Sequence, residues 1–193
     1  MEAKKTGELL IRDAEFSDIP AILEIYSYYV ENTAVSFELV TPDESAFRLR
    51  MENVKRRYPY LVALQDDRLI GYSYAGAFVG RPAYDRSAET TIYLARDVRG
   101  QGVGRKLYTE LQGRLKEMGI LNLYSRISYP KQEDEYLTWA SPLFHRAMGY
   151  VQAGMYTNCG RKFGRWYNMI VMEKELGPHT DDPDPLIWYP ELP

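Results

Sequence analysis

The pattern of apolar and polar positions predicts helices and strands that alternate along the chain. Apolar residues recur every three or four positions in 19–30 and again in 47–54, which is typical of two amphipathic helices. Ser17-Asp18 offers a cap for the first helix, and Thr41-Pro42-Asp43-Glu44 has the order of a capping box for the second, with Pro at the first helical position. Runs rich in β-branched and aromatic residues predict strands at 9–11, 58–64, 69–78, 89–95, 121–127, 150–157 and 166–172. Polar residues 65–68 join two of these strands as a hairpin, and a short helix is expected at 142–148.

The segment Arg99-Gly100-Gln101-Gly102-Val103-Gly104-Arg105 lies between a predicted strand and a predicted helix over 103–118 that Gly119 ends. The free amides of a helix's first turn attract anions, and glycines keep Cβ atoms out of the way of the ligand. A P-loop would need Gly-Lys-Ser/Thr at its end, and the dinucleotide fingerprint needs a different glycine spacing. The remaining alternatives are a pyrophosphate-binding loop and a glycine-rich turn that only packs a helix on a strand.

Composition narrows the classes of function. A chain of 193 residues with 45% hydrophobic content is sufficient for one domain with a core. A formal charge of −3 without a basic stripe argues against nucleic acid as a partner. One cysteine and two histidines leave no disulfide and no cluster with zinc spacing, so we expect no metal. Without a signal-peptide pattern or a long apolar stretch we expect no membrane association and a cytoplasmic location.

The glycine-rich segment resembles the acetyl-coenzyme A signature Arg-x-x-Gly-x-Gly of the GNAT-type N-acetyltransferases. The order of predicted elements is that of the same superfamily, and short strings spread over residues 8–176 resemble the phosphinothricin and methionine-sulfone acetyltransferases more narrowly. These strings are Tyr29–Phe37, Arg57–Val62, Tyr74–Gly76, Arg81–Tyr84, Glu89–Tyr93, His145–Tyr150 and Lys162–Trp166. The resemblance implies an α/β fold of the α+β kind, with a central mixed, mostly antiparallel sheet flanked by helices and a V-shaped splay at the cofactor strand. We expect a single domain over 1–177, followed by a tail rich in Pro and Asp over 178–193, whose Ile187-Trp188-Tyr189 cluster suggests docking.

The resemblance also implies roles for individual residues. Glu89 matches the family's general base, and His145 matches the group that protonates the coenzyme A thiolate. The alternatives are a solvated Glu at the start of a strand and a hydrogen-bonded structural His on an apolar helix face. The residues expected to bind acetyl-coenzyme A are Ile92, Tyr93 and Leu94 through their backbone beside the pantetheine arm, together with Arg99, Gly100, Gln101, Gly102, Val103, Gly104 and Arg105 around the pyrophosphate.

For the acceptor, the resemblance places Arg81 on a carboxylate, with Tyr84 and Phe37 around it. The family often carries a second basic residue two positions before this arginine, where this chain has Val79. The segment 128–140 is longer than the usual loop and could form a lid, a dimer contact or a plain surface insertion. Tyr167-Asn168 stands where relatives often have His-Asp, which points to a different amine.

The expected function is transfer of an acetyl group from acetyl-coenzyme A to the amine of a small, carboxylate-bearing, amino-acid-like substrate by direct attack in a ternary complex. One alternative is an acetyltransferase for a peptide N-terminus, a polyamine or an aminoglycoside. The other is a non-catalytic regulatory module that binds acyl-coenzyme A. Seventeen tyrosines and three tryptophans are typical of an aromatic core, and we expect a homodimer whose interface also uses such rings.

Overall fold

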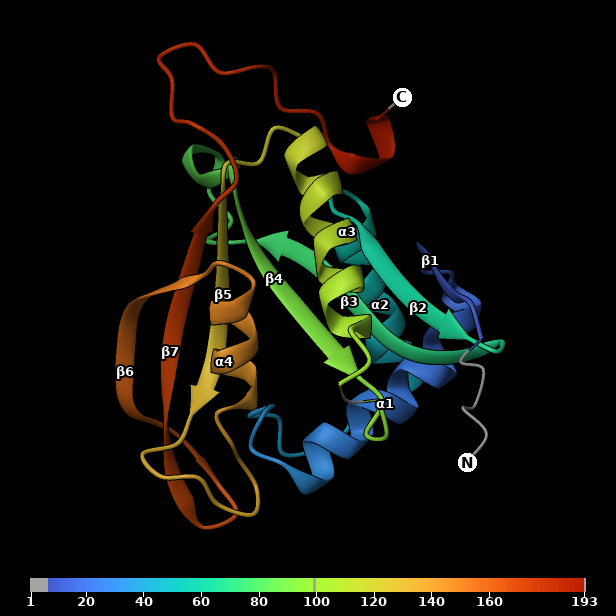
Figure 1. Ribbon diagram of the computed structural model, residues 1–193, viewed down its shortest axis with the longest axis vertical. Helices are drawn as coiled ribbons and strands as arrows, with labels where there is room; N and C mark the ends of the chain where they lie inside the picture. The colour runs from blue at the N-terminus through green and yellow to red at the C-terminus, as the bar shows by residue number, and fades with distance from the viewer. Residues whose placement is uncertain (1–6, 99, 193) are drawn as a thin grey trace.

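One seven-stranded sheet with the order β1-β2-β3-β4-β5-β7-β6 organises the molecule (Figure 1). The computed structural model describes residues 7–98 and 100–192. The elements along the chain are β1 (Leu9–Asp13), η1 (Phe16–Asp18), α1 (Ile19–Asn32), α2 (Glu44–Lys55), β2 (Tyr60–Gln65), β3 (Arg68–Ala77), η2 (Pro82–Tyr84), β4 (Ser87–Leu94), α3 (Val103–Glu117), β5 (Asn122–Tyr129), α4 (Ala140–Ala147), β6 (Val151–Lys162), β7 (Arg165–Glu175) and η3 (Tyr189–Glu191). The predicted helices and strands and their order are therefore confirmed.

The sheet opens between its two central strands. All neighbouring strands are antiparallel except β4 and β5, whose parallel ladder covers only the pairs from Ser87↔Asn122 to Glu89↔Tyr124. Beyond Glu89, β4 stays paired with β3, and β5 stays paired with β7 as far as Tyr129. The two halves of the sheet therefore diverge toward the C-terminal ends of β4 and β5, which confirms the expected splay.

The helices cover both faces of the sheet because the side chains of each strand alternate between the faces. On β4, Tyr93 points to α1, where its ring lies 5.3 Å from that of Tyr26 in an edge-on contact. Thr90 points to the opposite face, where its hydroxyl lies 2.6 Å from that of Tyr108 on α3. Thus α1 and α2 pack on one face, and α3 and α4 pack on the other (Figure 1).

Two local predictions changed in detail. The second helix begins two residues later than the capping box placed it, because Asp43 and not Thr41 is the N-cap and accepts from the amide of Ala46 at 2.8 Å. Pro42 therefore precedes the cap and is not the first helical residue. The predicted hairpin closes through Asp66 and Asp67, both with positive φ, as a two-residue turn with matching twist requires.

The segment after β7 returns across the C-terminal end of α3 to the region between α2 and β2 (Figure 1). The amide of Ile187 donates to the carbonyl of Met118 at 3.0 Å, and the amide of Tyr189 donates to that of Arg57 at the same distance. Trp188 packs edge-on against Tyr58, and the Arg57 guanidinium lies 4.7 Å from the centre of the Trp188 ring. The aromatic cluster of the tail is thus in contact with the core, as the sequence suggested.

Within residues 7–98 and 100–192, no helix has the length and apolarity needed to cross a membrane. The same described residues contain no cluster of three or more His, Cys, Asp or Glu that could hold a metal ion.

Candidate active site

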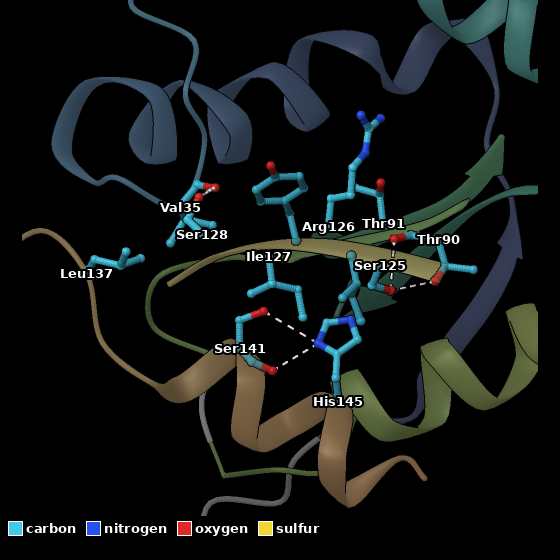
Figure 2. A pocket seen from close by; sticks show the side chains of 12 residues that line it. Val35, Thr90, Thr91, Ser125, Arg126, Ile127, Ser128, Leu137, Ser141 and His145 are labelled. Carbon is cyan, nitrogen blue, oxygen red and sulfur yellow. Dashed lines mark hydrogen bonds between the residues drawn. The ribbon is translucent and has the colours of Figure 1, made fainter. Parts of the chain in front are cut away.

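A cleft lies where β4 and β5 separate (Figure 2). Its walls come from both strands, one face of α4, and two loops, one after α1 and one before α4. The lining residues are Val35, Thr90, Thr91, Ile92, Tyr93, Ser125, Arg126, Ile127, Ser128, Leu137, Ser141 and His145. Because the parallel ladder stops at Glu89, the edge of β4 that faces β5 is free of the sheet along the cleft. The hydroxyl of Ser125 donates to the carbonyl of Thr90, and the hydroxyl of Tyr29 donates to the carbonyl of Leu94. Ile92 lies between these two residues along β4.

The cleft is lined by residues from both faces of the sheet, and the side chains on the two faces differ in chemical type. Figure 2 shows His145 and Ser125 on one side of the strands and the Arg126 side chain projecting from the other. Side chains alternate along β4, so Glu89 points to the face opposite that of its neighbour Thr90, which faces α3. Glu89 therefore lies on the same face as Arg126. The proposed base and the proposed acid therefore lie on opposite faces of the sheet.

Glu89 forms a two-pronged ion pair with Arg126. The Nε and Nη2 atoms of Arg126 lie 2.8 and 2.6 Å from the two carboxylate oxygens. The side chain of Glu89 is 21% exposed and that of Arg126 is 56% exposed, so the arginine covers the carboxylate from the solvent side. No local pattern in the sequence points to Arg126, because the two residues are 37 positions apart and meet only through the parallel pairing of β4 with β5.

His145 is buried and neutral. Its Nδ1 lies 2.9 Å from the carbonyl oxygen of Ser141, which is an acceptor only, so Nδ1 carries the proton. Its Nε2 then accepts from the hydroxyl of Tyr108 at 3.1 Å. Burial lowers the pKa of His145 to about 4, although the bond to Ser141 opposes that shift. At neutral pH the imidazole is therefore uncharged.

Tyr108 links His145 to a buried cluster of hydroxyl groups. Its oxygen lies 2.6 Å from that of Thr90, 3.0 Å from that of Ser125 and 3.4 Å from that of Tyr150. Burial raises the pKa of both Tyr108 and Tyr150. The tyrosines are therefore neutral, and the cluster is a continuous hydrogen-bonded path between α3, β4, β5 and the cleft.

The glycine-rich segment leads into α3, and no side chain of the cap residue bonds the first amides of this helix. We call these amides open. Gly102 is the N-cap with φ of 75°, and it has no side chain to bond the helix amides. A Cβ at Gly100 or Gly102 would meet nothing within 4 Å, so the space in front of the helix is open. Gly104 differs from both, because it is buried and its Cβ would lie 3.2 Å from Leu94 and 3.4 Å from Phe144. Gly104 therefore also lets the helix pack against these two residues, and the expectation that it leaves room for phosphate stays a prediction.

The remaining residues of this segment frame the same space. Val103 is buried under the first turn of the helix, whereas Gln101 and Arg105 are exposed. Arg99 lies outside the described residues. An anion in front of α3 would thus meet open amides, the positive end of the helix dipole and the exposed Arg105.

The three residues expected to hold the acceptor do not line the cleft. Arg81 and Tyr84 are exposed around η2, beside the start of β4 (Figure 1). Tyr84 contacts Phe78, which stacks on Tyr124 with ring centres 4.0 Å apart. Phe37 packs against Tyr167 and covers Gly160, where a Cβ would clash with the Phe37 ring.

The long loop before α4 is a fixed wall of the cleft. Arg165 pairs with Asp134 and Glu135, and the carbonyl of Tyr136 accepts from the amide of Ala34 at 3.0 Å. These contacts place Leu137 in the cleft with 3% exposure. Tyr167 donates to Asp134, and Asn168 accepts from the amide of Asn158, so neither residue lines the cleft.

Comparison with known proteins adds independent findings. The family model described as an acetyltransferase (GNAT) domain matches residues 11–171. The chain is 38% identical to the phosphinothricin N-acetyltransferase of Alcaligenes faecalis over 86% of this chain and 82% of that protein. It is 30% identical to the L-methionine sulfoximine/L-methionine sulfone acetyltransferase of Pseudomonas paraeruginosa over 90% and 98% of the two chains. The crystal structure of a GNAT superfamily phosphinothricin acetyltransferase from Sinorhizobium meliloti in complex with AcCoA is similar with a TM-score of 0.80 and 34% identity, over 94% of this chain and 98% of that one.

Proposed function

This chain belongs to the GNAT family of acetyltransferases, and from that premise we propose that it acetylates the amine of a small, carboxylate-bearing, amino-acid-like substrate. The observation that carries the proposal is the cleft between β4 and β5, whose lining residue Arg126 holds the Glu89 carboxylate beside one face, with the open N-terminus of α3 on the side of the other. The names of the relatives support the substrate class, since they act on phosphinothricin and on methionine sulfoximine or sulfone.

The chain's own residues fit acetyl-coenzyme A, which supplies the acetyl group as a reactive thioester. The open amides of α3, with Gly100, Gly102 and Arg105, would hold the pyrophosphate. The free edge of β4 at Ile92, Tyr93 and Leu94 would pair with the amides of the pantetheine arm. A backbone amide of this edge would also polarise the thioester carbonyl.

In this proposal Glu89 removes a proton from the acceptor ammonium. An α-amino group has an ordinary pKa near ~8, so much of it is protonated at neutral pH and a base is needed to expose its lone pair. Glu89 is partly buried and lies on the sheet face opposite His145, so the acceptor approaches from the side of α1. The neutral amine then attacks directly, without an acyl-enzyme. Cys159, the single cysteine, is exposed on β6 and does not line the cleft.

His145 serves the departing thiolate through the hydroxyl cluster. Because its pKa lies near 4, the resting group at neutral pH is not an imidazolium. As negative charge develops on the sulfur beside the ring, Nε2 of His145 takes a proton from the hydroxyl of Tyr108 and gives it to the thiolate. The oxygen of Tyr108 is then reprotonated from solvent through the hydroxyls of Thr90 and Ser125.

A thiol-release assay with acetyl-coenzyme A tests the proposal. The panel contains L-methionine sulfone, L-methionine sulfoximine, phosphinothricin, spermidine, an aminoglycoside and a peptide with a free N-terminus. We expect turnover of the amino-acid analogues and a kcat lower by roughly 10²- to 10⁴-fold in Glu89→Gln, with activity recovering at high pH, where the amine is already neutral. Turnover of only the polyamine, aminoglycoside or peptide would replace the substrate class, and no turnover with any amine would favour a regulatory module.

The proposal includes a homodimer in the cytoplasm. Exposed apolar side chains on the β6–β7 hairpin, including Met155, Tyr156 and Trp166, support a self-association surface. Size-exclusion chromatography with light scattering measures the mass directly, and a mass of 22.4 kDa, that of one chain, would refute the dimer.

A further inference from the structure

Arg126 is the charged residue that lines the cleft, whereas Arg81 is not among the lining residues. It projects from the same face as Glu89, which is the face from which the acceptor approaches in the proposed function. If the amine of a substrate lies at Glu89 and its carboxylate is on the neighbouring carbon, that carboxylate therefore lies beside Arg126.

The ion pair with Glu89 uses only one edge of the guanidinium. A guanidinium has five N–H groups, and Glu89 occupies Nε and one hydrogen of Nη2. The other hydrogen of Nη2 and both hydrogens of Nη1 receive no acceptor from residues 7–98 or 100–192. Two of these three N–H groups, one on Nη1 and one on Nη2, form a second fork, whose spacing matches the two oxygens of a carboxylate.

The charges of the pair also match an α-amino acid. Such a molecule carries an ammonium group and a carboxylate on the same carbon, so its opposite charges lie side by side. Glu89 and Arg126 present the complementary charges side by side, with their nearest atoms 2.6 Å apart. A polyamine or a peptide N-terminus has no such neighbouring carboxylate.

We propose that the free Nη1–Nη2 edge of Arg126 binds the α-carboxylate of the acceptor while the other edge holds Glu89 ready for the α-ammonium. This inference rests on the proposed function and assigns the carboxylate contact to a residue other than Arg81. Arg126 then has two effects: it selects α-amino acids, and it orients the base. The exposure of Arg126 lets the carboxylate reach the second fork without displacing Glu89.

The test compares L-methionine sulfone with its α-carboxamide on the wild type, Arg126→Gln, Arg126→Lys and the matched control Arg81→Gln. The readout is the ratio of kcat/KM for the acid to that for the amide. Loss of Arg126 also frees Glu89 and lowers turnover of both compounds, so the absolute rate does not decide the question. We expect a wild-type ratio of roughly 10- to 100-fold, as a charged hydrogen-bonded pair gives.

In Arg126→Gln the ratio falls to near one, in Arg126→Lys it is intermediate because a point charge lacks the fork, and in Arg81→Gln it stays at the wild-type value. Affinity for coenzyme A, measured by calorimetry, should be the same in all four proteins. A ratio kept in Arg126→Gln and lost in Arg81→Gln would overturn the assignment in favour of Arg81, and a wild-type ratio near one would also overturn it. Turnover of spermidine or a peptide without turnover of either sulfone compound would reject both this inference and the proposed substrate class. Turnover of the acid with an unchanged ratio in Arg126→Gln would reject this inference alone.

Discussion

At the scale of single residues, His145 shows how environment changes the meaning of a side chain. The resemblance assigned it the role of an acid, but a group with pKa near 4 holds almost no proton at neutral pH. An imidazolium at rest is therefore excluded as the proton source at that pH, whereas a relay from Tyr108 is consistent with the hydrogen bond to Nε2.

The depressed pKa of His145 predicts a loss of stability in acid. In the unfolded chain its pKa returns to about 6.5, so between pH 6.5 and 4 the unfolded state binds more protons than the folded one. The contribution is present above pH 6.5 and is lost as pH falls toward 4, by about 3 kcal/mol in total. Urea unfolding of the wild type and His145→Phe at pH 7 and 4.5 measures it, since the other titrating groups cancel in the difference. We expect the wild type to lose about 2 kcal/mol more than the variant; an equal loss in both proteins would contradict the buried neutral histidine.

At the scale of elements, the three glycines before and within α3 have separate purposes. Gly102 supplies a left-handed cap that leaves the first amides open, whereas Gly104 lets the helix approach Leu94 and Phe144. The first purpose bears directly on binding an anion.

This difference predicts the effect of a side chain at the cap. Asparagine tolerates positive φ, so Gly102→Asn preserves the fold while placing a side chain in the space in front of the helix. Affinity for coenzyme A should fall by at least about tenfold, the cost of one lost charged hydrogen bond, as measured by calorimetric titration. Gly113→Asn is the matched control, because Gly113 is exposed further along α3 with open space around it. Equal affinities in the two variants would remove the anion site from this helix end.

At the scale of the whole molecule, the tail connects elements that are distant in sequence. Tyr189 donates to Asp13 at 2.8 Å and also contacts Arg114, so it joins β1 to α3. None of the tail residues as far as 192 lines the cleft, and the contacts of the Trp188 region lie with α3 and the segment after α2. The tail therefore stabilises the fold without forming part of the site.

Removal of one tail anchor should lower stability and leave catalysis unchanged. Trp188→Ala loses the contacts with Tyr58 and Arg57 and should reduce the free energy of unfolding by about 2 kcal/mol, less than for a fully buried tryptophan. Trp166→Ala is the control, because Trp166 is 59% exposed and its loss should change stability by no more than about 0.5 kcal/mol. Denaturant unfolding and the thiol-release assay measure the two quantities. A similar change in both variants would show that the tail contacts contribute nothing.

The sequence by itself determined the order of helices and strands, the hairpin, the glycine-rich approach to α3 and the resemblance that singled out Glu89 and His145. These features are local, because periodicity, turn chemistry and short motifs act within a few neighbouring residues. Tertiary structure decided the ion pair of Glu89 with Arg126, the neutral state of His145 and the packing role of Gly104. It also placed Phe37, Arg81 and Tyr84 outside the lining of the cleft and Leu137 within it. The physical reason is that ion pairs and desolvation depend on which atoms are neighbours in space, and here those neighbours are brought together by strand pairing between segments that no local pattern connects.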